Sequence, residues 1–91
     1  MGRVDCCAMD GYRLLFYSND HHPAHVHVAR PGEWEIRVDI LETTEDELVF
    51  DVKWPGNYRG PSRQVRKALC AMICAHREDL LEEFERKVHT Q

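Results

Sequence analysis

The segment SNDHHPAHVHV at 18–28 gathers four of the six histidines of this 91-residue chain. The four are His21, His22, His25 and His27. Because side chains alternate along a β-strand, His25 and His27 are expected on one face, about 7 Å apart. The polar turn residues before them are expected to fold back and bring His21 and His22 close to that face, with Asn19 and Asp20 beside them. The spacing therefore predicts one site rather than scattered surface residues.

Such a cluster suits two kinds of chemistry. Neutral imidazole binds zinc and other divalent transition metals, and two imidazoles with a carboxylate resemble a metal site that keeps an open position. Histidines with pKa values near neutrality also act as general acids and bases. We therefore take His21, His25 and His27 as candidate catalytic residues, and the same three with Asp20 as candidate zinc ligands, in an exposed or half-exposed site. A structural or partner-binding role for these histidines stays open.

The elements that must position this cluster follow from hydrophobic periodicity. Strands are predicted at 12–18, 25–28, 33–41 and 48–54, with Trp34 and Ile36 on the buried face of the third. A helical pattern runs from the region of Ser62 to Val88, with a bend near 76–79 as an alternative. These elements predict an α+β fold, a small antiparallel sheet of three to four strands packed against one long C-terminal helix. The length indicates a single domain, 1–91.

Several helix residues raise further alternatives. His76 lies on the apolar stripe and is expected in the core, although it could instead complete the histidine cluster. Cys70 and Cys74 are one helical turn apart, so they are expected to be reduced thiols, with a zinc site shared with a histidine as the alternative. A second apolar edge extends beyond the main stripe and predicts a homodimer. Its members are Cys70, Cys74, Leu81 and Val88.

The run FYSNDHHPAHVHV, followed by a short sheet and a C-terminal helix, resembles the uncharacterised prokaryotic family called domain of unknown function 4160. The residues that carry the resemblance are Phe16, Tyr17, Ser18, Asn19, Asp20, His21, Pro23, His25 and His27. The resemblance implies a compact bacterial or phage-borne protein. It also implies a gene beside another small gene, as in toxin–antitoxin or defence loci. It implies no particular reaction.

Charge gives further expectations about partners. The formal net charge is −4, which disfavours broad nonspecific binding to nucleic acid. The predicted helix nevertheless begins with a basic group, Arg63, Arg66 and Lys67, where the helix dipole favours anions. We take these three as a candidate site for an anion or a nucleic-acid backbone, with pairing to the chain's own acids as the alternative. No segment is apolar enough for a membrane span, and no signal peptide is evident, which predicts a cytoplasmic protein.

Two function classes follow. The first is an interaction module that binds a protein partner, such as a toxin–antitoxin or defence component or an inhibitor. The second is a small histidine-dependent enzyme, with His25 and His27 either as metal ligands or as acid/base groups and Arg63 holding phosphate; a nuclease or phosphodiester hydrolase is the favoured type. The sequence favours the interaction module, because no activated serine or cysteine and no repeated carboxylate pattern for two metals is present.

Overall fold

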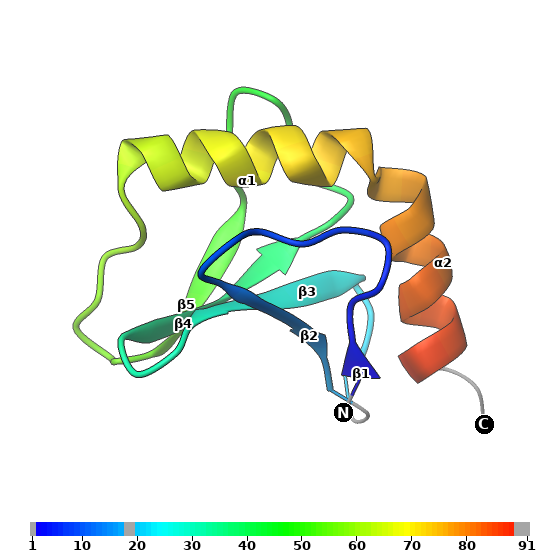
Figure 1. Ribbon diagram of the computed structural model, residues 1–91, viewed down its shortest axis with the longest axis horizontal. Helices are drawn as coiled ribbons and strands as arrows, with labels where there is room; N and C mark the ends of the chain where they lie inside the picture. Colours follow the sequence, from blue (N-terminus) through cyan, green and yellow to red (C-terminus); the bar gives the residue numbers. More distant parts are fainter. Residues whose placement is uncertain (1, 18–19, 89–91) are drawn as a thin grey trace.

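The computed structural model describes residues 2–17 and 20–88 (Figure 1). Five antiparallel strands lie in the order β1-β2-β3-β4-β5, so every strand pairs with its neighbour in the chain. Two helices follow the sheet. The strands are β1 (Gly2–Arg3), β2 (Arg13–Phe16), β3 (His25–Arg30), β4 (Trp34–Asp39) and β5 (Phe50–Trp54), and the helices are α1 (Arg63–Ala75) and α2 (Arg77–Val88).

The α+β class is confirmed, but the predicted number of strands is one too low. The additional strand, β1, has only two residues, and they pair with Phe16 and Leu15 of β2. Two residues are too few to show the alternation by which a strand is recognised in a sequence. The alternation of the longer strands is confirmed, since Val26, Val28 and Ile36 are completely buried and Trp34 is nearly so.

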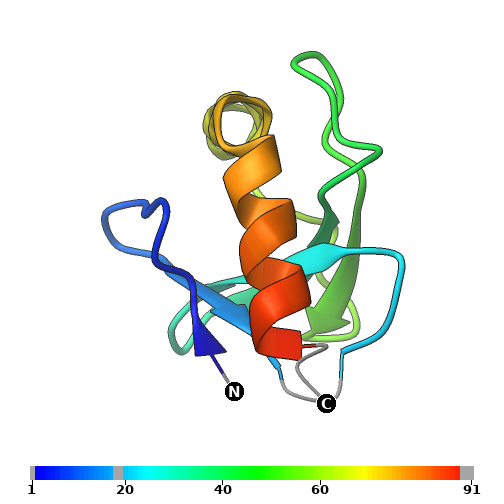
Figure 2. The same cartoon turned by 90° about the vertical axis from the view of Figure 1, so that its right-hand side faces the viewer.

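The prediction of one long helix is also wrong, because the chain leaves helical geometry at His76, where the alternative of a bend near 76–79 placed the change of direction. Ser62 caps α1 as expected, accepting a hydrogen bond from the Val65 amide. Figures 1 and 2 show α1 lying across one face of the sheet and α2 turning down past its end. Arg77 fixes the turn, since its guanidinium donates to the backbone carbonyls of Ile40 and Thr43. His76 therefore marks the turn between the helices.

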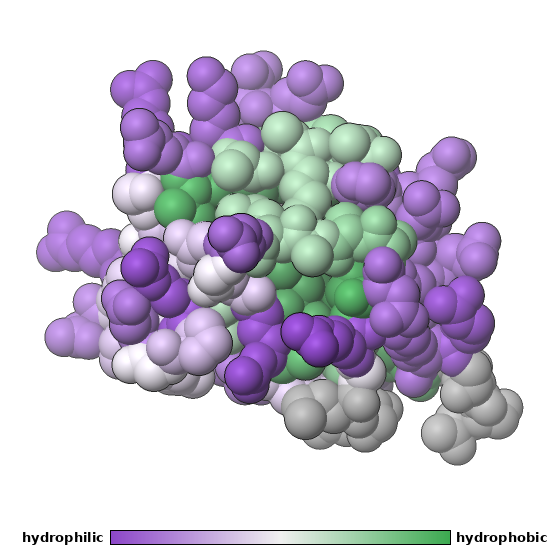
Figure 3. Space-filling model, in the orientation of Figure 1, coloured by the Kyte–Doolittle hydropathy of each residue, from purple (hydrophilic) through white to green (hydrophobic). Residues whose placement is uncertain are grey.

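The second apolar edge of the helices is largely covered within the monomer. Cys70 and Val88 are buried, whereas Cys74 and Leu81 are half-buried. The Arg77 guanidinium lies 3.6 Å from the Cys74 sulfur. Figure 3 shows pale-green hydrophobic residues over α1 and the segment in front of it, rather than along an isolated helix edge. The homodimer stays a prediction, but this edge no longer supports it.

Glu83 of α2 anchors the N-terminal segment. Its carboxylate is buried and accepts hydrogen bonds from the backbone amides of Asp5, at 2.9 and 3.1 Å, and Cys6, at 2.6 Å. The Lys87 ammonium lies 3.0 Å from the same carboxylate and 2.9 Å from Asp5. One buried acid therefore ties the start of the chain to its last helix.

Candidate metal centre

The centre is built on β3 and on the loop that precedes it. Val26 and Val28 point into the core, so the intervening His27 and the preceding His25 belong to the other face of the strand. The loop returns Asp20 to this face and is tied by two hydrogen bonds. Asp20 N donates to the Tyr17 carbonyl at 3.0 Å, and Tyr17 N donates to Asp20 Oδ2 at 2.9 Å. The other carboxylate oxygen, Oδ1, is left facing the histidines.

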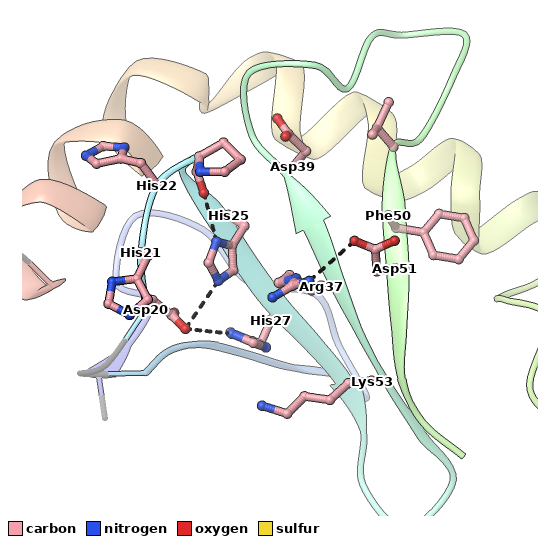
Figure 4. A pocket seen from close by; sticks show the side chains of 12 residues that line it. Asp20, His21, His22, His25, His27, Arg37, Asp39, Phe50, Asp51 and Lys53 are labelled. Carbon is pink, nitrogen blue, oxygen red and sulfur yellow. Dashed lines mark hydrogen bonds and ion pairs between the residues drawn. The ribbon is translucent and has the colours of Figure 1, made fainter. Parts of the chain in front are cut away.

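Three side chains converge on one point (Figure 4). Asp20 Oδ1 lies 3.2 Å from His25 Nε2 and 3.1 Å from His27 Nε2. One ligand atom from each residue lies within 4.8 Å of the others. Ligand atoms around one tetrahedral zinc ion are roughly 3.3 Å apart, given metal–ligand bonds of about 2.0–2.2 Å. The spacing of the three side chains therefore fits a single small cation.

The opposite nitrogen of each ring faces an acceptor. His25 Nδ1 donates a hydrogen bond to the Pro23 carbonyl at 2.9 Å, so in the neutral ring Nε2 carries the lone pair. His27 Nδ1 lies 3.3 Å from Glu35 Oε2, and the Tyr17 hydroxyl donates to the same oxygen at 2.9 Å. Metal-binding histidines characteristically direct their second nitrogen at a carbonyl or a carboxylate in this way. Both rings are therefore oriented with Nε2 toward the shared point.

Without a cation, the hydrogen bonding of this cluster is incomplete. His25 Nε2 and His27 Nδ1 are buried and make no hydrogen bond of acceptable geometry to any part of the chain that the structure describes. Each nevertheless lies within 3.3 Å of a carboxylate oxygen. A neutral imidazole has only one N–H, so His27 cannot donate to Asp20 and Glu35 at once. The cluster lacks one positive group, which either a proton or a metal ion supplies.

The surroundings favour the ionisation states that bind metal. Burial lowers the pKa of His27, and this effect exceeds the opposing influence of Asp20, so the ring is neutral at neutral pH. Burial alone would raise the pKa of Asp20, but the Tyr17 amide and His27 outweigh it and hold the pKa below its ordinary value. Burial, followed by the hydrogen bond to Glu35, raises the pKa of Tyr17 and keeps its hydroxyl a donor. Neutral imidazole and ionised carboxylate are the forms that ligate metals.

The cluster lies in the wall of a polar pocket of about 490 Å³ (Figure 4). The pocket is continued by charged residues of β4, β5 and their flanks. The helix α2 contacts one member of the cluster, since the Phe84 ring centre is 5.8 Å from that of His25. The lining residues are Asp20, His21, His22, Pro23, His25, His27, Arg37, Asp39, Val49, Phe50, Asp51 and Lys53.

Not all of the predicted site residues come together in the structure. Asp20, His25 and His27 lie together, whereas His21 is exposed and lines the pocket without joining the three. The expectation of an exposed or half-exposed site is wrong for the two strand histidines, which are only 7% and 2% exposed. Asp20 contacts both rings and the Tyr17 ring packs against His27, and a strand pattern does not show such contacts. Ser18 and Asn19 lie outside the described residues.

From the sequence, no role was assigned to Glu35, which alternates with the core residues Trp34 and Ile36 along β4 but is itself buried. His27 pairs with Arg37 across β3 and β4, so Glu35 is its diagonal neighbour. The signal that could have revealed it is the turn at Pro31–Gly32, which fixes the register of this hairpin. Tyr17 was noted only as part of the motif, yet its hydroxyl holds the Glu35 carboxylate in place.

The remaining sequence candidates lie elsewhere. Arg63, Arg66 and Lys67 are exposed and do not line the pocket. Arg66 donates hydrogen bonds to the backbone carbonyls of Pro61 and Arg59. These partners within the chain are backbone oxygens, not the acidic side chains that were the alternative. Anion binding at this helix start stays a prediction. His76 is likewise absent from the pocket lining. Among residues 2–17 and 20–88, the Asp20 cluster is the only group of three potential metal ligands, so no site at Cys70 and Cys74 is supported.

A buried carboxylate and two buried imidazoles in the wall of a polar pocket define a small α+β protein with a candidate mononuclear metal centre. The chain belongs to the family described as Domain of unknown function (DUF4160), whose profile matches residues 11–85. This match confirms the resemblance seen in the sequence. Comparison with curated proteins and with solved structures finds no significant match. Within the described ranges, neither helix has the length and apolar character needed to cross a membrane.

Replacing Tyr17 with phenylalanine tests the support of His27. The substitution removes the hydrogen bond that the Tyr17 hydroxyl donates to Glu35, and so loosens the carboxylate that His27 Nδ1 faces. Loss of such a partner weakens metal binding by about 10- to 100-fold. We expect this decrease in zinc affinity by calorimetric titration, with little change in the melting temperature of the metal-free protein. The matched control is Tyr12→Phe, because the Tyr12 hydroxyl contacts Arg30 rather than Glu35; equal affinity in the two variants would contradict the role of Tyr17.

Proposed function

We propose that this protein binds one divalent transition-metal ion, zinc in the first instance, through Asp20, His25 and His27, and uses it in a hydrolytic reaction. The observation that carries the proposal is the convergence of two buried Nε2 atoms on one carboxylate oxygen, at 3.2 and 3.1 Å. The outward-facing nitrogens, held toward Pro23 and Glu35, support it independently. Three protein ligands leave a fourth position of a tetrahedral ion open, as in catalytic zinc sites.

We assign a hydrolytic reaction because of the open coordination position and the charged residues of the pocket. A zinc ion held by these three ligands would lower the pKa of a bound water to near 7 and would polarise a carbonyl or phosphoryl group through its oxygen. The chain itself holds the ligands in the wall of the pocket, with Glu35 and the Pro23 carbonyl fixing the histidine rings. Lys53 and Arg37 supply positive charge beside the cluster (Figure 4). This arrangement favours an enzyme over a purely structural role for the histidines.

Metal analysis of untagged protein tests this function, since a histidine tag would itself bind metal. We expect one equivalent of zinc per chain after dialysis against a zinc buffer, together with a higher melting temperature, because a ligand that binds only the folded state stabilises it. His27→Gln is expected to lose the zinc, whereas His21→Gln, which alters an exposed histidine of the same pocket, is expected to keep it. Wild-type protein without bound zinc, or equal zinc content in both variants, would contradict the proposal.

The interaction module in a toxin–antitoxin or defence locus stays a second prediction. It rests on the genomic arrangement that the family resemblance implies, and no described residue adds to it. Copurification of the chain with the product of the neighbouring gene is the measurement that checks it. The cytoplasmic location and a nucleic-acid partner likewise stay predictions.

A further inference from the structure

The pocket continues beyond the three proposed metal ligands, and its continuation carries two cations. Lys53 comes from β5 and Arg37 from β4, and the side chains of both are about half exposed, at 49% and 51%. Figure 4 shows both beside His27. Arg37 is directly opposite His27 in the β3–β4 register, which places their Cβ atoms roughly 4.5–5.5 Å apart.

Contacts with Tyr17 and Glu35 position the Lys53 side chain, but they do not occupy its hydrogen-bond donors. Its ammonium nitrogen lies 4.4 Å from the centre of the Tyr17 ring, a cation–π contact, and 4.0 Å from Glu35 Oε2. Both partners also belong to the support of His27, so the ammonium stands next to the cluster. In the ranges 2–17 and 20–88, its N–H groups donate no hydrogen bond, since the Glu35 oxygen is beyond hydrogen-bonding distance. Three donors are therefore available at the wall of the pocket.

The acidic residues of the pocket do not neutralise the Lys53 charge at the end of the pocket next to the proposed metal ion. Asp51 faces Arg37 at 3.4 Å, a long contact that leaves further guanidinium donors free. Asp39 accepts hydrogen bonds from the amides of Leu41 and Glu42, which directs its carboxylate to that loop. A divalent ion at the centre offsets the charges of Asp20 and Glu35. Lys53 then gives the metal end a positive charge.

We propose, resting on the proposed metal-dependent function, that the substrate is a small phosphoester whose phosphoryl oxygens are held by Lys53 and Arg37 beside the metal ion. A phosphoryl group has enough oxygens to contact a metal ion and two cations at once, whereas a carboxylate has only two. Arg and Lys are the side chains that recognise phosphate, as a fork and as a point charge respectively. A pocket of about 490 Å³ fits a ligand of mononucleotide size, which falls within the usual range of small-molecule sites.

Binding of adenosine monophosphate (AMP) and adenosine to zinc-loaded protein tests this inference, because the two probes differ by the phosphate alone. We expect AMP to bind at least about tenfold more tightly than adenosine, since a charge-assisted hydrogen bond contributes about 1.5–3 kcal/mol. Lys53→Met should weaken AMP binding roughly tenfold or more without changing the zinc content. Arg37→Met should act in the same direction. Lys67→Met, which removes a cation at the start of α1, should leave AMP affinity within about twofold.

The results separate this inference from the proposed function. Zinc-loaded protein that binds AMP and adenosine equally would overturn the phosphoester assignment while leaving the metal centre intact. If Lys67→Met weakens AMP binding as much as Lys53→Met does, the phosphate binds at the start of α1 instead. That result would also overturn the phosphoester assignment. Wild-type protein that takes up no zinc would remove the proposed function, and the phosphoester assignment that rests on it would fail too.

Discussion

The variant Asp20→Asn is expected to lose zinc binding and, in the absence of metal, to melt at a higher temperature than the wild-type protein. Both effects have one cause. The asparagine oxygen can still accept the Tyr17 amide hydrogen bond, while its NH₂ group takes the position of Oδ1 between His25 and His27. That group donates two hydrogen bonds, so both Nε2 lone pairs acquire a donor. His27 Nδ1 then carries the ring's proton and donates to Glu35.

The expected size follows from the cost of unpaired buried atoms. An unsatisfied buried polar group costs about 1–3 kcal/mol, so we expect a gain of about 1 kcal/mol for the metal-free variant. For a domain of this size that is a rise of roughly 4–8 °C in melting temperature. Zinc affinity should fall by at least about 100-fold, because a neutral amide replaces an anionic ligand. Thermal denaturation with a chelator and calorimetric zinc titration check the two effects; a destabilised variant that binds zinc normally would contradict this account of Asp20.

Glu83→Gln is expected to lower the free energy of unfolding by about 2 kcal/mol, since hydrogen bonds to charged groups contribute about 1.5–3 kcal/mol. Both carboxylate oxygens accept amides of the N-terminal segment, so a glutamine NH₂ must face one of these N–H donors. Lys87 loses its buried partner at the same time. Glu82→Gln is the matched control one position earlier on α2, where the side chain is 77% exposed and paired with Arg86. Its effect should stay within about 0.5 kcal/mol; equal losses in the two variants would contradict the role given to Glu83.

The stabilisation by Glu83 should also depend on pH in a defined direction. Burial would raise the pKa of its carboxyl group, but the amides of Asp5 and Cys6 and the Lys87 ammonium outweigh burial and lower the pKa. A lowered pKa in the folded state stabilises the fold above the unfolded-state pKa, about 4.3. This contribution is lost as the pH falls through the lower folded-state value. Chemical denaturation of wild type and Glu83→Gln should therefore give free energies that converge below about pH 4.

The parts of the fold that could be predicted are those that local periodicity records. The alternation of Val26, Val28 and Ile36 identified the buried faces, and Ser62 identified the start of α1. The two-residue strand β1 carries no such pattern. A bend near 76–79 was only one alternative from the sequence, because the contacts of Arg77 that accompany the turn reach carbonyls more than thirty residues earlier in the chain, which no local pattern contains.

The candidate site shows the same division. The spacing of His25 and His27 predicted that they share one face of a strand. The turn chemistry predicted the return of His21, with Asp20 beside it, but only Asp20 joins the two histidines. Their burial could not be predicted, because it requires the path of the loop over the strand. Glu35 is one of several polar residues that alternate regularly along β4. Only the register of β4 with β3 distinguishes it from its neighbours. Residue types thus indicated the three side chains that converge, together with His21, which does not join them, whereas tertiary contacts supplied the groups that orient the rings.

X-ray diffraction from zinc-loaded crystals, with anomalous differences collected on both sides of the zinc absorption edge, tests the metal centre most directly. The structure predicts one strong anomalous peak per chain, within about 2.0–2.2 Å of Asp20 Oδ1, His25 Nε2 and His27 Nε2. It also predicts that His25 Nδ1 still faces the Pro23 carbonyl and that His27 Nδ1 still faces Glu35. Fully zinc-equilibrated crystals with no peak at these three atoms, or with zinc bound only at exposed histidines such as His21, would contradict the assignment.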